Sequence, residues 1–137
     1  MSFLTIFIAP KPFIDAHIIT IQRNAIRSWI QLGSEVEILL IGDEPGIQEE
    51  AVYFGVRHLP EVKRNKYGTP LISSIFELAR EGNDSRMLAY VNADILLMSD
   101  FLLAAKSGLS KWDKFMMVGQ RWDMEIVEEL DFSSGWE

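Results

Sequence analysis

The sequence predicts an α/β fold of the Rossmann-like type, with three layers (α/β/α) and a mainly parallel sheet. Short β-branched and aromatic runs alternate along the chain with segments of helix length. Most of these runs are apolar almost throughout, as expected for strands that are covered on both faces. No repeat, low-complexity tract or linker divides the chain, so residues 1–137 are expected to form a single domain.

The first strand and the first helix are expected between residues 3 and 33. Phe3–Ala9 is rich in Phe, Ile and Thr and stops at Pro10-Lys11-Pro12, as a buried strand does where it meets a loop. A helix then begins at Asp15, a suitable N-cap, and stops at Gly33, a suitable C-terminal cap. Its apolar residues recur at steps of three or four and define one face: Ile14, Ile18, Ile21, Ala25, Trp29 and Leu32.

The same alternation continues from residue 36. Val36–Ile41 is a β-branched run that predicts a second strand, and several turn-forming residues follow it at 42–46. A short helix is expected over Ile47–Phe54, and Gly55 separates it from a weak third strand over Val56–Leu59.

Two further strands and two further helices are expected after residue 68. Thr69-Pro70 resembles an N-cap followed by proline at the first helical position, so a helix is expected from there to Gly82. Met87–Val91 predicts the fourth strand, and a helix is expected from Ser99 to Ser107. Phe115–Gln120 predicts the fifth strand.

The composition excludes several classes of function. The 137 residues include 20 acidic and 13 basic ones, and the formal charge of −7 repels phosphate backbones, so nucleic acid is not expected as a partner. There is no cysteine, which excludes disulfides, thiolate metal sites and thiol nucleophiles. No apolar run is long enough to span a membrane. The chain is therefore expected in the cytoplasm, with peripheral membrane contact left open.

The residues directly after the strands are the first candidates for a ligand site, because open α/β sheets bind ligands outside the carboxyl ends of their strands. These residues are Pro10-Lys11, Gly42-Asp43 and the segment 92–94. Asn92 and Asp94 are two residues apart and fall on one side of the strand, where they could bind Mg²⁺ or Mn²⁺. The other interpretation is that both simply terminate a strand. The apolar residues on either side favour the metal, since a buried setting is a poor one for a solvated turn.

Charged residues near this edge have two interpretations each. Asp43 could accept a hydrogen bond from the imide of a uracil, or it could be a turn former. Lys63, Arg64 and Lys66 form a basic cluster ahead of the helix expected at Thr69. The cluster could hold phosphate together with free N–H groups, or it could be a solvated loop.

Taken together, these segments resemble the N-terminal, donor-binding part of GT-A fold glycosyltransferases, the nucleotide-diphospho-sugar transferases, of a family 2-like kind. The segment Tyr90-Val91-Asn92-Ala93-Asp94-Ile95-Leu96 resembles their Asp-x-Asp motif. The resemblance implies that a nucleotide sugar, with a UDP-sugar favoured, binds here and that its sugar is transferred to an acceptor. It implies that the base is held by Pro10, Lys11 and Asp43, the diphosphate by Arg64 or Lys66, and a divalent metal and the ribose by Asn92 and Asp94.

The sequence departs from the GT-A pattern in two ways. Asn92 stands where the motif usually has its first acid, which removes one charge and leaves Asp94 as the main metal ligand. Such enzymes also continue into an acceptor half that carries the catalytic base of inverting members, so the sequence resembles a truncated GT-A domain and no catalytic residue is assigned.

Other classes remain open. A nucleotidyltransferase shares the sheet, but its glycine-rich loop has no counterpart in Ala9-Pro10-Lys11-Pro12. A receiver domain requires an acidic pair after the first strand, which is missing here. A non-catalytic nucleotide-binding or assembly module of the same fold is the third alternative.

The segment after Gln120 predicts self-association. It sets large apolar residues among acids and has no evident partner in the chain: Trp122, Ile126, Leu130, Phe132 and Trp136. Because apolar patches are rare on soluble monomers, a homo-oligomer is expected.

Overall fold

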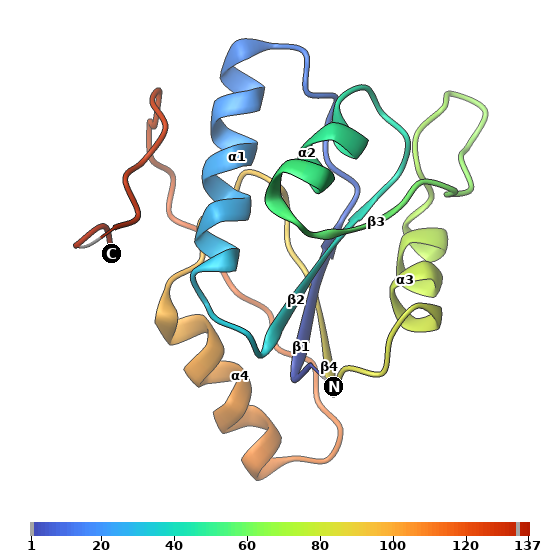
Figure 1. The fold of residues 1–137 in the computed structure, drawn as a ribbon. Helices are drawn as coiled ribbons and strands as arrows, with labels where there is room; N and C mark the ends of the chain where they lie inside the picture. Colours follow the sequence, from blue (N-terminus) through green and yellow to red (C-terminus); the bar gives the residue numbers. More distant parts are fainter. Residues whose placement is uncertain (1, 134) are drawn as a thin grey trace.

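The computed structural model describes residues 2–133 and 135–137. In this part of the chain a four-stranded, all-parallel sheet has the order β3-β2-β1-β4. Its strands are β1 (Leu4–Ile8), β2 (Val36–Ile41), β3 (Arg57–Leu59) and β4 (Met87–Tyr90). The helices that alternate with them are α1 (Ala16–Ile30), α2 (Ile47–Phe54), α3 (Ile72–Glu81) and α4 (Ser99–Lys111). The predicted α/β, Rossmann-like fold with a parallel sheet is confirmed (Figure 1).

Helices cover both faces of the sheet. Ile6 on β1 belongs to a core shared with α1, α2 and α4, whereas the adjacent Phe7 belongs to a second core shared with α3. This division follows from the alternation of side chains along a strand. In Figure 1, α1 and α2 lie on one side of the strands and α3 lies on the other. None of the helices described here is long and apolar enough to cross a membrane.

Helix α1 begins as predicted, but its buried face differs from the expected one. The carboxylate of Asp15 accepts hydrogen bonds from the backbone N–H groups of His17 and Ile18 at 2.9 and 3.1 Å. The helix ends at Ile30, before Gly33. Ile14, which was expected on the apolar face, is 70% exposed because it precedes the N-cap. Ala25 and Trp29 are fully buried as expected, and the buried face also includes polar residues: Gln22, Asn24 and Ser28.

The loops that follow β1 and β2 are held together by a close contact. The backbone N–H of Phe13 donates to the carbonyl of Pro45 at 2.8 Å. Gly46 has φ +88°, and a Cβ at this position would lie 2.6 Å from the Cβ of Phe13. Any other residue would therefore push the two loops apart.

Helix α3 begins later than expected. Thr69-Pro70 does not form its N-terminus, because Pro70 pairs with Arg64 in an antiparallel bridge. Leu71 is the residue that precedes the first turn, and it donates its backbone N–H to the carbonyl of Lys63 at 2.8 Å. The helix stops at Gly82, as predicted.

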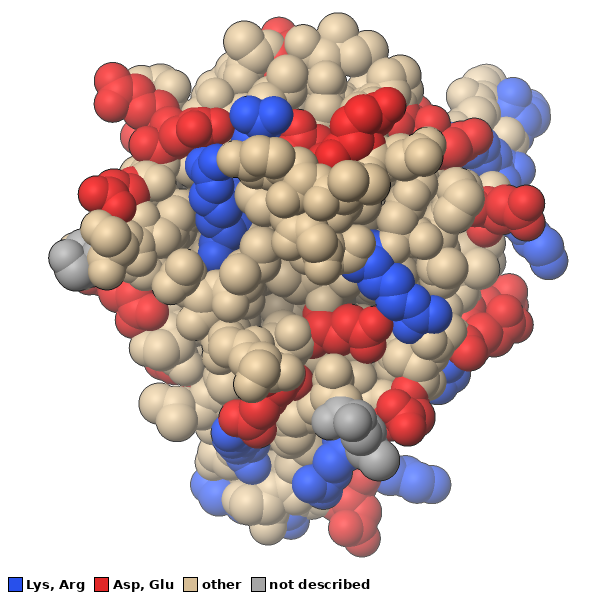
Figure 2. All heavy atoms as spheres, in the orientation of Figure 1, with Lys and Arg blue, Asp and Glu red and all other residues tan. Residues whose placement is uncertain are grey.

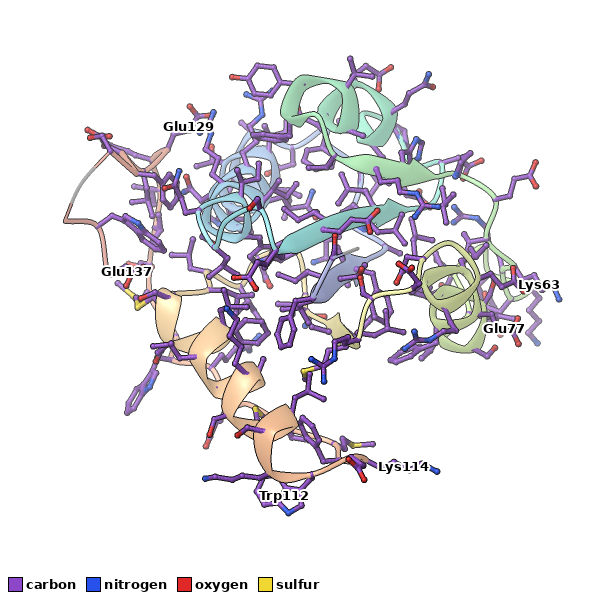
Figure 3. All side chains as sticks on the ribbon, turned by 60° about the horizontal axis from the view of Figure 1, so that its bottom comes forward. Lys63, Glu77, Trp112, Lys114, Glu129 and Glu137 are labelled. Carbon is purple, nitrogen blue, oxygen red and sulfur yellow. The ribbon has the colours of Figure 1, made fainter. Side chains whose placement is uncertain are left out.

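The expected fifth strand is absent from the described part of the chain, so the prediction for Phe115–Gln120 was wrong. Helix α4 continues past Ser107 to Lys111, and the chain then turns back on it, with Phe115 packed against Gly108. Figure 3 shows Trp112 and Lys114 at this far end of α4. A β-branched or apolar run becomes a strand only where a neighbouring strand pairs with it, and this segment lies against a helix.

The C-terminal segment has a partner in its own chain, contrary to expectation. The side chain of Asn24 donates to the carbonyl of Glu128 at 2.9 Å and accepts from the N–H of Leu130 at 2.8 Å. Glu129 lies beside α1 in Figure 3, with its carboxylate 3.4 Å from both Arg23 and Arg27. In contrast, Trp122 is 93% exposed.

Candidate functional site

Three strand ends meet at one edge of the sheet, which we call the rim. β1 pairs with β2 through Ile8 and Leu40, and with β4 through Phe7 and Tyr90. Continued along the chain, this register places Pro10 between Gly42 and Ala93. The chain moves from β1 to β2 and β3 on one side and places β4 on the other, so the topological switch point lies between β1 and β4. Ligands of open α/β sheets bind at this point.

The loop after β1 is fixed by a buried side chain. Pro10 is buried, whereas Lys11 is exposed. The amide of Gln22 donates to the carbonyl of Lys11 at 3.0 Å and accepts from its backbone N–H at 2.8 Å. Gln22 is only 2% exposed, so a buried amide holds the backbone of Lys11 while the residue itself is exposed at the surface.

The turn after β4 presents two polar side chains. β4 ends at Tyr90, and the N–H of Ile95 donates to the carbonyl of Asn92 at 3.1 Å. Asn92 and Asp94 are exposed, whereas Val91 and Ala93, which directly precede them, are buried. The two polar residues therefore lie on the solvent side of the turn. The interpretation that Asp94 occupies a buried setting was wrong, because the turn carries it out of the sheet.

The chain leaving this turn is bound to α1. The indole N–H of Trp29 donates to the carbonyl of Ile95 at 2.9 Å. The hydroxyl of Ser28 accepts from the N–H of Leu97 at 3.0 Å. Both side chains of α1 are fully buried. The sequence marked Trp29 only as an apolar residue, and a polar contact with a segment 66 residues away leaves no signal in a single sequence.

The loop after β2 is joined to the basic cluster by Arg64. Its guanidinium lies 2.6 Å from the carboxylate of Asp43 and also contacts that of Glu44. It donates as well to the carbonyl of Gly68 at 2.8 Å. The hydrogen bond to Glu44, followed by the charges of Glu44 and Asp43, raises the pKa of Arg64 above its ordinary value. Two acids therefore offset this one cation.

The remaining cations of the cluster are exposed. Lys63 and Lys66 are both on the surface, and the ammonium group of Lys66 lies 5.0 Å from the ring centre of its neighbour Tyr67. The face shown in Figure 2 has acidic and basic side chains interspersed among uncharged ones. His58 on β3 lies with Nε2 2.6 Å from the carbonyl of Gly42 and supports the start of the loop that carries Asp43.

The rim offers few protein ligands for a metal ion. Within residues 2–133 and 135–137, no three acidic or histidine side chains come together in an arrangement that could hold one. Asn92 and Asp94 supply one amide and one carboxylate. Mg²⁺ commonly takes one or two carboxylates, completing its shell with waters and substrate phosphates. The residues present therefore fit a metal ion that enters together with a diphosphate.

A hollow of about 540 Å³ opens at the opposite end of the sheet. It lies between the C-terminal ends of α1 and α2, where Ile30, Gly33, Val36, Phe54 and Arg57 are among its lining residues. It shares no residue with the rim, and the two charged residues of its lining, Glu37 and Arg57, are paired with each other at 3.3 Å. We therefore base the candidate site on the switch point.

The topology defines the class of protein: a small Rossmann-like α/β domain whose parallel sheet has the order 3-2-1-4. Comparisons of the chain with models of protein families, with curated proteins and with solved structures find no match.

Proposed function

We propose that the rim binds a nucleotide-diphosphate sugar and that the chain is a glycosyltransferase-type donor domain, with UDP-sugars as the favoured ligands. The observation that supports it is the register at the switch point. It brings Lys11, Asp43 and Asp94 to the same edge from three separate strands. A nucleotide, a diphosphate and a metal ion need contacts of these three kinds in one place.

Asp43 is the proposed partner of the base. One of its carboxylate oxygens is held by Arg64 at 2.6 Å, and 70% of the side chain is exposed. In the proposed complex the second oxygen accepts a hydrogen bond from the imide N–H of a uracil. An acceptor held in place by an ion pair loses less conformational entropy on binding than a free one.

Lys66 and Lys11 are better placed than Arg64 to attract the diphosphate. Arg64 was expected to serve as a phosphate ligand, but it is engaged by two carboxylates. Lys11 and Lys66 have no acidic partner among the ion pairs of the described residues. A flexible ammonium group that is free of acids can follow a phosphate oxygen.

Asp94, assisted by Asn92, is the proposed ligand of Mn²⁺ or Mg²⁺. When bound, the cation would offset the negative charge of the leaving diphosphate. Asp94 would supply a charged oxygen and Asn92 a neutral one, both from the solvent side of the same turn. The nucleotide itself is therefore expected to provide much of the metal's affinity for the rim.

Isothermal titration calorimetry with UDP, GDP, dTDP and the matching nucleotide sugars tests this proposal. Each titration is made with excess Mn²⁺ and again with EDTA. We expect one nucleotide to bind in preference to the others, and to bind more tightly with Mn²⁺. Absence of binding by every nucleotide to the folded chain would overturn the proposal.

One observation favours a second candidate, a nucleotide-binding module without turnover. Arg64 pairs with Glu44, and in the proposed complex Asp43 accepts from the base and Asp94 holds the metal ion, so none of these three acids is left to act as a general base. Release of UDP from a UDP-sugar, followed over time with purified protein, distinguishes the two functions. Binding without release supports the module, and release above the level without protein supports the transferase.

A further inference from the structure

Helix α1 carries several buried polar side chains. Gln22 and Asn24 are each 2% exposed, and Ser28 is fully buried. A buried polar group costs free energy unless it is hydrogen-bonded. Among the residues described, no buried side-chain nitrogen or oxygen lacks a partner. The partners of these α1 side chains therefore show what their burial achieves.

The two ends of the buried face bind the two loops that flank the switch point. Gln22 holds both backbone groups of Lys11, on the exit from β1. Trp29 holds the carbonyl of Ile95, directly after the turn that presents Asp94. The hydroxyl of Ser28 accepts from the N–H of Leu97, two residues further along the same segment.

We propose that Gln22, Ser28 and Trp29 are positioning residues, through which α1 fixes the Lys11 loop relative to the Asn92–Asp94 turn. Gln22 and Trp29 are seven residues apart, so they lie on one side of the helix with about 10 Å of rise between them. Because a helix is stiff over this length, the spacing of the two loops is set by α1. The part of this inference that concerns nucleotide binding depends on the proposed function.

The arrangement matters because the two loops would hold different parts of one ligand. In the proposed complex Lys11 serves the nucleotide and its phosphates, and Asp94 serves the metal ion. A ligand bound at both places requires their separation to be correct within a fraction of an ångström. Side chains that touch no ligand can thus determine affinity, provided that they hold the backbone of residues that do.

Two variants test the contacts to the two loops separately. Gln22→Met removes both hydrogen bonds to Lys11 with little change of volume, and Trp29→Phe removes the N–H donor to Ile95. Ser28→Ala is a smaller change at the Leu97 contact, in case Trp29→Phe does not fold. Ile26→Val is the matched control, because Ile26 is a fully buried residue of α1 that packs in the core and makes no such contact. Gln22→Glu keeps an acceptor for the N–H of Lys11 and tests for partial rescue.

Amide hydrogen exchange and UDP titration are measured on each full-length variant. We expect Gln22→Met to expose the Lys11 amide selectively, and Ser28→Ala and Trp29→Phe to expose that of Leu97. We expect Gln22→Met to weaken UDP about tenfold with Mn²⁺ and with EDTA alike. Trp29→Phe should weaken chiefly the Mn²⁺-dependent part, and Ile26→Val neither.

The outcomes distinguish this inference from the proposed function. If wild-type chain binds no nucleotide, the proposed function fails, while selective exposure of the Lys11 and Leu97 amides still supports positioning by α1. If the variants only raise exchange throughout the domain, as Ile26→Val would, positioning is overturned. It is also overturned if UDP affinity is unchanged when the local amides are exposed.

Discussion

The guanidinium of Arg64 lies 2.6 Å from the carboxylate of Asp43 and joins the loop after β2 to the loop before α3. Arg64 is the more enclosed partner, with a quarter of its side chain exposed against 70% for Asp43. The ion pair with Arg64 therefore holds the carboxylate of Asp43 in place, while most of the Asp43 side chain is exposed to solvent.

Replacement of Asp43 tests the role of this carboxylate. We expect Asp43→Ala to weaken UDP binding by roughly tenfold or more, because an acceptor for the base is lost. Calorimetry measures the affinity, and circular dichroism shows whether the fold is intact. Glu49→Ala is the control, since it removes an exposed acid from α2 and changes the net charge equally. Unchanged affinity in folded Asp43→Ala would exclude Asp43 from base recognition.

Asp94 is expected to be responsible for the effect of Mn²⁺ on nucleotide affinity. Asp94→Ala should abolish the difference between titrations with Mn²⁺ and with EDTA, whereas Asn92→Ala should reduce it only partly, because a neutral amide is the weaker ligand. Asp113→Ala, which removes an exposed acid beyond α4, should leave the difference intact. Equal nucleotide binding by the wild-type chain with EDTA and with Mn²⁺ would contradict a metal role for Asp94.

The pair between Arg23 and Glu50 is expected to stabilise the fold. Glu50 is 7% exposed, and Arg23 contacts both of its carboxylate oxygens at 2.7 to 3.1 Å. Arg23→Ala would leave a buried carboxylate without its cation, so we expect a loss of about 1–3 kcal/mol in the free energy of unfolding. Urea titration measures it. Arg86→Ala, at an exposed arginine ahead of β4, should change it by less than about 0.5 kcal/mol.

The loss in Arg23→Ala should depend little on pH near neutrality. The hydrogen bond to Glu50 raises the pKa of Arg23 above its ordinary value, burial opposes this rise, and the charge of Glu50 adds to it. Stability that comes from a raised pKa is fully present below the unfolded value and disappears only as pH rises through the folded one. Urea titrations at about pH 6 and pH 9 should therefore give the same difference between variant and wild type. A difference that disappears at the higher pH would show that another group titrates.

Self-association is expected through the exposed apolar residues that follow α4. Val118 is 84% exposed and Trp122 is 93% exposed. Light scattering at micromolar concentration should detect an oligomer that dissociates in the double variant Val118→Lys, Trp122→Glu. Tyr53→Glu, at an exposed aromatic residue of α2, is the control. A wild-type chain that remains monomeric would exclude this surface as an interface.

Local patterns predicted the elements that neighbouring residues determine. β2 and α2 have the predicted bounds, since the turn residues at 42–46 and Gly55 delimit them in the sequence. The N-cap of α1 at Asp15 was also predicted, because a capping carboxylate bonds to residues two and three positions later.

Elements that depend on distant partners were predicted less well. Phe115–Gln120 has a strand-like composition, but it lies beside the C-terminal end of α4. Phe115 packs against Gly108 of that helix. Thr69-Pro70 has the pattern of a helix start, but the bridge between Arg64 and Pro70 takes it out of the helix. The candidate rim residues could be chosen from strand ends, whereas the roles of Gln22 and His58 depend on contacts 11 and 16 residues away.

The two hydrogen bonds between Asn24 and the C-terminal segment have a consequence for synthesis on the ribosome. All four strands are complete once Tyr90 has emerged, so the sheet and α1 can assemble early. The amide of Asn24, however, is matched by backbone groups that are translated 104 and 106 residues later. Until Leu130 has left the exit tunnel, the amide of Asn24 lacks these partners and remains hydrogen-bonded to water. The nascent chain therefore passes through a stage in which the Asn24 side of α1 is still hydrated. Docking of the C-terminal segment on that side is among the last steps of folding.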